Sequence, residues 1–436
     1  AGEVGSNVAA SLADSHEVVV IDLDSDRVEA LTYSLDVLPV EGDGSSLETL
    51  REAGVDEADM VIACTDDDET NIVTCGTVQT VSEAFTIARV RTTKFLDTWE
   101  QSEGALGVDL MVGTNLLAAQ SIVRVIGLPA AEDVDRFADG LVQMAEFPID
   151  DESPVTGKSV AEADTFDSLT FAAIIRDDEV VIPDGETCLL DGDDLVVIGS
   201  PESVSGFATT IAPGVDGVSD VMVFGGSDIG YETAQLLGQK GLHSRIVEPD
   251  PEHARFLAEK LPDVTVLQND PTDREFLQRE HIADVDVAIA SLDSDEQNLL
   301  TALLAKRLGA DRAIAIVEDG DYADLFEAVG VDVAVNPREA IAEEITRFTR
   351  EKHAENVALI EDDRAEVLEV EVDAESVLVD RPIRESIADL PDGVVIGAIT
   401  RDGAFVVPRG DTIIREDDHI VVFASTAIVE EAMQLI

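Results

Sequence analysis

The sequence repeats itself once, and this repeat constrains the fold more than any other feature. Gly5 and Gly230 open matching segments that lie 225 residues apart. Two further pairs of segments match in the same order and near the same offset: VIACTDDDETN (61–71) with AIASLDSDEQN (288–298), and AAIIRDDEVVIPDGETCLLDGDDLVVIGS (172–200) with GAITRDGAFVVPRGDTIIREDDHIVVFAS (397–425). Self-similarity at a fixed period indicates that one structural unit occurs twice. We therefore predict two copies of one unit.

The first part of each copy alternates short Val/Ile-rich runs with helical segments. This alternation is typical of a parallel sheet that is buried on both faces, as in a Rossmann-type fold. The first copy is predicted to have helices at 5–13, 25–34, 45–53 and 69–81, and strands at 16–22, 37–40, 58–64 and 85–90. The second copy follows the same order from 221–226 to 310–317.

The second part of each copy consists of short strands separated by turns. Asp-Gly and Asp-Asp pairs between Val/Ile runs predict hairpins, including a turn at Asp402–Gly403. The predicted fold class is thus α/β, with two Rossmann-like parallel-sheet domains that are each followed by a small α+β domain. The predicted boundaries are 1–130, 131–213, 214–355 and 356–436.

The chain is strongly acidic along its whole length, with 93 acidic against 28 basic side chains and a net charge of −65. Such a field repels nucleic acid and anionic lipid, so we expect neither as a direct partner. A dispersed acidic surface suits a cytoplasm that holds molar salt, because salt screens the repulsion. The composition predicts a haloarchaeon-like halophile. The alternative is an ordinary acidic protein with a basic partner.

The cysteines and the apolar runs exclude other classes of protein. Cys64, Cys75 and Cys188 form no paired motif, and we interpret all three as small buried hydrophobic residues. The sequence has neither a signal peptide nor an apolar run near 18 residues, so direct membrane insertion is not expected.

Glycine-rich loops stand at the start of both copies. Gly2 and Gly5 fit the second and third glycines of a G-x-G-x-x-G dinucleotide-binding loop, without the strand and glycine that precede them in that motif. The second copy has Gly225 and Gly230, but Ser227 stands at the middle position, where glycine lets the backbone approach a pyrophosphate.

An acidic residue ends the strand that follows each loop, Asp22 in the first copy and Glu248 in the second. A carboxylate about 20 residues after the loop accepts hydrogen bonds from ribose hydroxyls and repels a 2′-phosphate, which favours NAD over NADP. The alternative is a solvated acid. Asp43 and Asp270 follow the third strand and are expected beside the adenine, or else as helix N-caps.

The next two strands distinguish the copies. Thr65 is expected to reach the nucleotide, and Leu292 replaces it in the second copy. Arg89 and Arg91 offer cations to phosphate, whereas the second copy has no arginine there. We therefore expect the second copy to bind its nucleotide more weakly, or to bind a different one.

The sequence lacks the groups that an enzyme of this fold needs. None of the six histidines has a metal-binding spacing, and no catalytic triad pattern or nucleophile elbow is visible. A dehydrogenase needs an acid–base group aimed at the nicotinamide, and the small hairpin domains offer none that recurs. An NAD-dependent oxidoreductase remains the less favoured alternative.

Taken together, these stretches resemble the TrkA family of regulatory subunits of Trk potassium-uptake systems, which carry tandem RCK (KTN) domains. The resemblance covers the whole chain in the order RCK-N, RCK-C, RCK-N, RCK-C, through AGEVGSNVAASL, VIDLDSDRVEAL and IARVR in the first copy, EQNLLTALLAKRLGADRAIAIV in the second, and GKSVAEAD in the first hairpin domain.

The resemblance implies that the chain binds NAD(H), or ATP and ADP, and has no enzymatic activity. It implies a first site of Ala1, Gly2, Glu3, Val4, Gly5, Asp22, Asp43, Thr65, Asp66 and Arg89. It implies a second site of Gly225, Ser227, Asp228, Ile229, Gly230, Glu248 and Asp270. No metal site and no catalytic residue are expected.

The resemblance further implies a homo-oligomeric ring, expected to be tetrameric, beneath a TrkH-like membrane potassium channel or transporter. The chain would then be cytoplasmic and held at the inner face of the membrane by that partner. Helices at 115–126 and 340–349 are expected to pair adjacent domains, or else to pack within one domain. An alternative partner is another cation channel or an antiporter.

Overall fold

The computed structural model describes residues 2–13, 16–102, 105–151, 153–176, 179–212, 217–350, 356–360, 364–374 and 376–436. It divides into two compact units. Unit 1 comprises Ala1–Val123 and Val218–Thr346, and unit 2 comprises Arg124–Gly217 and Arg347–Ile436. Unit 1 thus holds the first part of both copies, and unit 2 holds the second part of both. The four predicted domain boundaries stay a prediction.

The first copy within unit 1 is an α/β arrangement of parallel strands. Its strands pair as β1 with β2, and as β3-β4-β5. Its helices and strands are α1 (Glu3–Ala13), β1 (Val19–Asp22), α2 (Ser25–Ser34), β2 (Leu38–Glu41), α3 (Leu47–Glu52), β3 (Met60–Ala63), α4 (Asp68–Val78), β4 (Phe85–Val90), α5 (Thr93–Gln101), β5 (Leu110–Gly113) and α6 (Thr114–Ile126).

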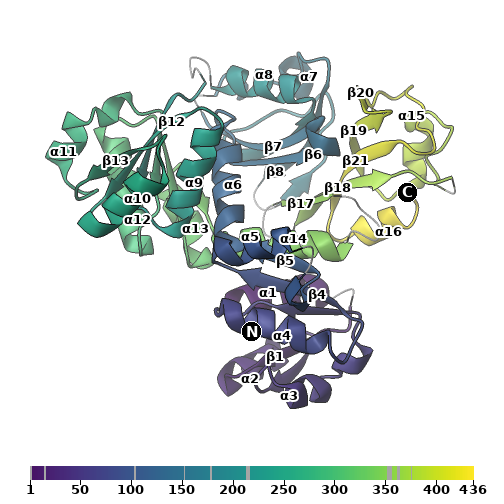
Figure 1. Ribbon diagram of the computed structural model, residues 1–436. Coiled ribbons are helices and arrows are strands. Elements are labelled where there is room, and N and C mark those ends of the chain that lie inside the picture. The colour runs from purple at the N-terminus through teal and green to yellow at the C-terminus, as the bar shows by residue number, and fades with distance from the viewer. Residues whose placement is uncertain are drawn as a thin grey trace. The chain divides into compact units, whose positions relative to one another are not determined.

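The second copy within unit 1 forms one parallel sheet in the order β13-β12-β11-β14-β15-β16, which is the Rossmann order. Its elements are β11 (Asp220–Phe224), α9 (Asp228–Gln239), β12 (His243–Glu248), α10 (Pro251–Lys260), β13 (Thr265–Gln268), α11 (Arg274–Arg279), β14 (Val287–Ala290), α12 (Asp295–Leu308), β15 (Arg312–Ile316), α13 (Ala323–Ala328), β16 (Val333–Val335) and α14 (Pro337–Arg350). Figure 1 shows α9, α10, α12 and α13 packed against the strands of this sheet.

The sequence pattern explains why these strands are central. Residues of β11, β14 and β15 are almost wholly buried, because helices cover the sheet and leave its apolar side chains no contact with water. In the second copy β11 joins β12 to β14, whereas among the described residues of the first copy no strand joins β1-β2 to β3-β4-β5. Both copies place the carboxyl ends of their strands next to the start of α1 or α9.

Unit 2 contains two antiparallel sheets of the same design, in the orders β6-β7-β10-β8-β9 and β17-β18-β21-β19-β20. The elements of the first are β6 (Asp133–Phe137), β7 (Val142–Ile149), α7 (Val160–Ala163), β8 (Leu169–Arg176), β9 (Glu179–Val181), β10 (Asp193–Gly199) and α8 (Pro201–Ile211). Those of the second are β17 (Asn356–Ile360), β18 (Ala365–Glu371), α15 (Ile383–Ser386), β19 (Val395–Arg401), β20 (Ala404–Val406), β21 (His419–Ser425) and α16 (Val429–Met433).

The two sheets of unit 2 share one apolar core. Phe137 and Met144 of the first sheet lie in the same buried cluster as Val367 and Phe423 of the second. Thr170 adds a hydrogen bond across this contact, from Oγ1 to the carbonyl oxygen of Gly397 at 2.9 Å. The hairpin domains therefore pair with each other.

The predicted elements agree with the structure except at some ends. The helix at 25–34 and the strand at 85–90 are confirmed, but the strand predicted from residue 16 begins at Val19. The turn at Asp402–Gly403 is confirmed, with φ angles of 51° and 72° that suit a tight hairpin. The prediction that all three cysteines are buried is wrong: Cys75 is buried, Cys64 is half-buried and Cys188 is exposed in the loop between β9 and β10.

Candidate nucleotide site

The glycine loop of the second copy needs glycine at two positions. Gly225 has a φ of +95°, and a side chain there would lie 2.3 Å from the carbonyl oxygen of Ser291. A side chain at Gly230 would lie 2.4 Å from the carbonyl oxygen of Gly225. Ser227 is the N-cap of α9: its Oγ accepts a hydrogen bond from the Gly230 N–H at 3.3 Å and lies 2.6 Å from Ser291 Oγ. The serine therefore has a structural role at the middle position.

The loop of the first copy leads directly into α1. Gly5 lies against Cys64 at the end of β3, where an added Cβ would be 3.4 Å from the sulfur. Val4 is buried, as is Ile229 in the second copy. Of the other predicted residues here, Ala1 lies outside the described residues, as does the side chain of Glu3.

The acid at the end of the next strand lies beside the loop in the second copy. Glu248 is 7% exposed and accepts hydrogen bonds from the N–H groups of Gly226 and Asp250, each at 2.9 Å. Asp22 accepts one from the Asp24 N–H at 2.8 Å in the first copy. Glu248 thus fixes the loop that it was predicted to face, while the ribose role of both acids stays a prediction.

Asp43 and Asp270 occupy equivalent exposed turns after the third strand. The Oδ1 atom of Asp43 accepts hydrogen bonds from the N–H and the hydroxyl of Ser45, and Asp270 does the same with Thr272. These bonds stabilise the ionised form, so they lower the pKa of both carboxyl groups. The N-caps of α3 and α11 are Ser46 and Asp273 instead, so the helix-cap alternative is wrong for this pair.

A buried asparagine ties the ends of two neighbouring strands in each copy. The Asn71 amide donates to the carbonyl oxygens of Thr65 and Arg89, each at 2.9 Å, and its oxygen accepts from the Thr65 N–H and hydroxyl. In the second copy the Asn298 amide donates to the carbonyl oxygens of Leu292 and Ile316, and its oxygen accepts from the Leu292 N–H. The Thr65 hydroxyl, which was predicted to reach the nucleotide, is therefore held by Asn71.

Two arginines of the first copy converge on one carboxylate. Arg89 is 4% exposed, donates from Nε to Thr114 Oγ1 at 3.2 Å, and places Nη1 3.4 Å from Asp66 Oδ1. Arg91 pairs with the same oxygen of Asp66. Burial, with a contribution from Arg91, lowers the pKa of Arg89 from its ordinary value. At the equivalent positions of the second copy stand Ile316 and Glu318.

An aspartate fixes the backbone at this point in both copies, and the one in the first copy, Asp68, is buried. Asp68 accepts hydrogen bonds from the N–H groups of Arg91 and Thr92, at 2.9 and 3.0 Å. Asp295 accepts from Glu318 and Asp319 in the same way. The recurrence of Asp68 and Asn71 as Asp295 and Asn298 is the signal that could have revealed their roles.

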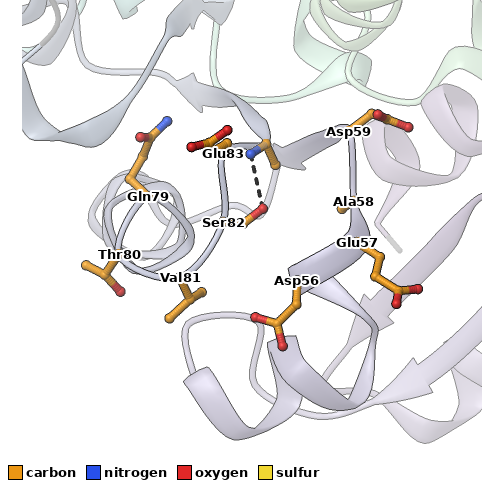
Figure 2. Close-up of a pocket in the computed structure, with 10 residues that line it drawn as sticks. Asp56, Glu57, Ala58, Asp59, Gln79, Thr80, Val81, Ser82 and Glu83 are labelled. Carbon is orange, nitrogen blue, oxygen red and sulfur yellow. Dashed lines mark hydrogen bonds between the residues drawn. The ribbon is translucent and has the colours of Figure 1, made fainter.

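A further hollow lies at the opposite edge of the first-copy sheet. It is lined by residues 56–59 and 79–84, just before β3 and β4 begin. Figure 2 shows the carboxylates of Asp56, Asp59 and Glu83 around it. The negative charge of these carboxylates disfavours an anionic ligand. The carboxyl edge of the strands is therefore the better candidate for a nucleotide site than this hollow. Across the described parts of the chain, no three His, Cys, Asp or Glu side chains are placed to hold a metal ion.

Comparison with known proteins decides the family. The TrkA-N domain matches residues 1–113 and 221–337, and the TrkA-C domain matches residues 144–211 and 367–436. The chain is 35% identical to "Trk system potassium uptake protein TrkA homolog 1" of Methanosarcina mazei, over 99% of this chain and 97% of that protein. It is 36% identical to the TrkA homolog of Archaeoglobus fulgidus, over 100% and 98%.

The chain belongs to the TrkA family. The two relatives from Methanosarcina mazei and Archaeoglobus fulgidus are both named as Trk system potassium uptake protein homologs. Among solved structures, the GsuK channel bound to NAD is similar in fold, with a TM-score of 0.61 and 19% identity over 99% of this chain and 77% of that chain. The TrkA-N matches cover both Rossmann-like parts, and the TrkA-C matches cover both hairpin parts. Within the described residues no helix is long and apolar enough to cross a membrane.

Proposed function

We propose that this TrkA-family chain is a nucleotide-sensing regulatory subunit that controls a membrane potassium channel or transporter of the TrkH type. The observation that carries the proposal is the first copy's carboxyl edge. A glycine loop, the carboxylate of Asp22 and the guanidinium groups of Arg89 and Arg91 all belong to this edge, in a chain whose relatives are potassium uptake proteins.

The first copy is proposed as the principal site for NAD(H), ATP or ADP. Asp22 would accept hydrogen bonds from the adenosine ribose, and the start of α1 would receive phosphate. The second copy is proposed as a weak site or a structural one. Its Ile316 and Glu318 supply no cation, and the hydroxyl of Ser227 is already bonded to Ser291.

The proposed mechanism needs differential binding and no catalysis. A nucleotide that binds one ring shape better than another shifts the population toward that shape, and the ring transmits the shift to the pore. Paired hairpin domains such as those of unit 2 suit a homo-oligomeric ring, proposed here as a tetramer. The chain would lie in the cytoplasm at the inner face of the membrane, held there by its partner. The acidic surface supports a host with high internal salt, proposed to be haloarchaeon-like.

Gene deletion tests this proposal. Loss of potassium uptake in the deletion strain, restored by the wild-type gene, would support it, as would co-purification of a TrkH-like protein. Unchanged uptake together with a co-purified antiporter or other cation channel would contradict it and favour the alternative partner. Hydride transfer from NADH to any substrate on a broad panel would favour the oxidoreductase instead.

A further inference from the structure

We propose that Asp66 competes with the phosphate of the ligand for Arg89 and Arg91, and so sets the preference of the first site among nucleotides. This inference rests on the proposed nucleotide binding at that site. It assigns Asp66 a role opposite to that of a binding residue, because the carboxylate must leave the arginines before a phosphate can contact them.

The contacts show that Asp66 takes the place of a phosphate oxygen. One oxygen, Oδ1, faces both guanidinium groups, with Arg89 Nη1 at 3.4 Å and Arg91 Nη2 as its second partner. Arginine binds carboxylate and phosphate through the same planar set of N–H donors. An anionic ligand and Asp66 therefore require the same donors.

The side chain of Arg89 and the backbone of Arg91 have other hydrogen-bond partners, whereas the carboxylate of Asp66 is largely exposed. Arg89 is held by Thr114, and the backbone of Arg91 is held by the buried carboxylate of Asp68. The Asp66 side chain is 76% exposed. Because the Asp66 carboxylate lies largely in water, its departure leaves no buried charge of its own, and the phosphate of the ligand takes its place beside the buried Arg89.

The second copy provides a natural comparison. Asp293 stands at the position of Asp66, but Ile316 and Glu318 replace the two arginines. Glu318 instead pairs with Arg338 at 3.3 Å. An exposed acid at this loop position is thus present in both copies, and only in the first can it compete for cations. Asp293 is therefore a matched control for Asp66.

The position of the arginines indicates which ligands feel the competition. In the second copy, β12 and β15 lie on opposite sides of β11 and its glycine loop, with β14 between β11 and β15. The equivalent strands of the first copy are β1, which ends in Asp22, and β4, which contains Arg89. A nucleotide whose ribose is held at Asp22 extends its far end toward the arginines. That end is a negatively charged terminal phosphate in ATP and the nicotinamide riboside, which carries no negative charge, in NAD. The effect should therefore be larger for ATP.

The test is calorimetric titration of ATP and NAD into the full chain and into its D66N and D293N variants. All titrations use one KCl concentration, at which circular dichroism shows the variants folded. For D66N we expect ATP to bind about twofold to fivefold more tightly and NAD to change by less than about twofold, the size expected when a largely exposed carboxylate stops competing for the arginines. D293N should change neither affinity, and an R91Q variant should lose the ATP gain when combined with D66N.

Three results would overturn the inference while leaving nucleotide binding intact. These are weaker ATP binding by D66N, unchanged ATP binding, and an equal gain for ATP and NAD that D293N also shows, which would reflect net charge alone. Absence of binding by the wild-type chain to either nucleotide would contradict the proposed function itself, and the inference with it.

Discussion

The side-chain amide of Asn71 donates a hydrogen bond to the backbone carbonyl of Arg89 at 2.9 Å, with Asn71 fully buried. This bond fixes the end of β4, from which the Arg89 and Arg91 side chains extend. Asn298 makes the same bond to Ile316 in the second copy, where no phosphate-binding cation follows. This hydrogen bond is therefore part of the fold in both copies. Only in the first copy does it also position two arginines for a candidate phosphate site.

Replacing Asn71 with Ala should destabilise unit 1, because the carbonyl oxygens of Thr65 and the buried Arg89 lose their donor. We expect a loss of about 1–3 kcal/mol in the free energy of unfolding. Asn298→Ala should cost a similar amount, and Glu69→Ala, at an exposed position of the same helix, should cost little. Chemical denaturation at a fixed KCl concentration gives the free energy of unfolding of the three variants. If only one of the two asparagine variants is destabilised, the two asparagines do not have equivalent roles.

Replacing Asp22 with Ala should weaken nucleotide binding by about 1.5–3 kcal/mol, the value of a hydrogen bond to a charged group. The control is Glu29→Ala, an exposed acid on α2, which changes net charge equally. Equilibrium titration with NADH and ATP gives the affinities. If Asp22→Ala and Glu29→Ala bind alike, Asp22 does not contact the ribose.

A buried ion pair recurs in the hairpin domains and should be important for their stability. Arg401 donates to Asp418 through Nε and Nη2, at 2.7 and 2.6 Å, and Arg176 does the same with Asp193. Both aspartates are 1% exposed. Asp418→Ala leaves its arginine without this partner, so we expect a loss of about 3–5 kcal/mol. Thermal unfolding of Asp418→Ala and of the exposed control Glu416→Ala measures this loss of stability. Equal melting temperatures for the two variants would contradict the prediction.

Asp133 should make stability depend on pH near neutrality. Burial, with the neighbouring carboxylate of Asp135, raises its pKa to about 7. The folded state then binds a proton that the unfolded state has already released, so this group reduces stability as pH rises from about 4 to about 7. Asp133→Asn should remove that decrease and leave unit 2 more stable at pH 8 than the wild type. Denaturation midpoints at pH 5.5 and 8, with Asp151→Asn as the exposed control, test this, and identical pH profiles would contradict it.

The net charge of −65 predicts strong salt dependence. Repulsion among dispersed carboxylates is screened at 1 M salt, where the Debye length is about 3 Å, and acts at low ionic strength. We expect unfolding or dissociation of the oligomer as KCl falls well below molar. The melting temperature should rise with KCl. A melting temperature that stays constant from about 0.1 to 3 M KCl would contradict the prediction that this protein is adapted to high salt.

The fold could be predicted from the sequence where the pattern is local or repeated. The Val/Ile runs at 85–90 and 221–226 mark buried strands, and the Asp-Gly pair at 402–403 marks its hairpin, because period and turn chemistry are visible in single segments. Strand ends such as Val19 are less visible, since pairing with a neighbouring strand decides them. Cys188 was predicted to be buried and is exposed, because the sequence around a single cysteine in a loop does not reveal how much of its side chain other segments cover.

The site could be predicted only in outline. Residue types at strand ends indicated Asp22, Arg89 and Arg91, but the direction of a side chain depends on neighbours that are distant in sequence. Asp66 was expected to bind ligand, which stays a prediction, and its pairing with both arginines was not expected. Asp43 was expected beside the adenine or at a helix cap, and its carboxylate holds a turn. Neither contact has a signature in the spacing of residues.

The most direct test of nucleotide sensing is calorimetric titration of the full chain in about 2–3 M KCl, where screening is strong, with NADH, NAD, ATP, ADP and NADPH. The account predicts micromolar binding of at least one of the first four, about one strong site per chain, and no binding of NADPH. Absence of binding by all five would contradict it, and so would two equally strong sites, because the second copy lacks the cations of the first.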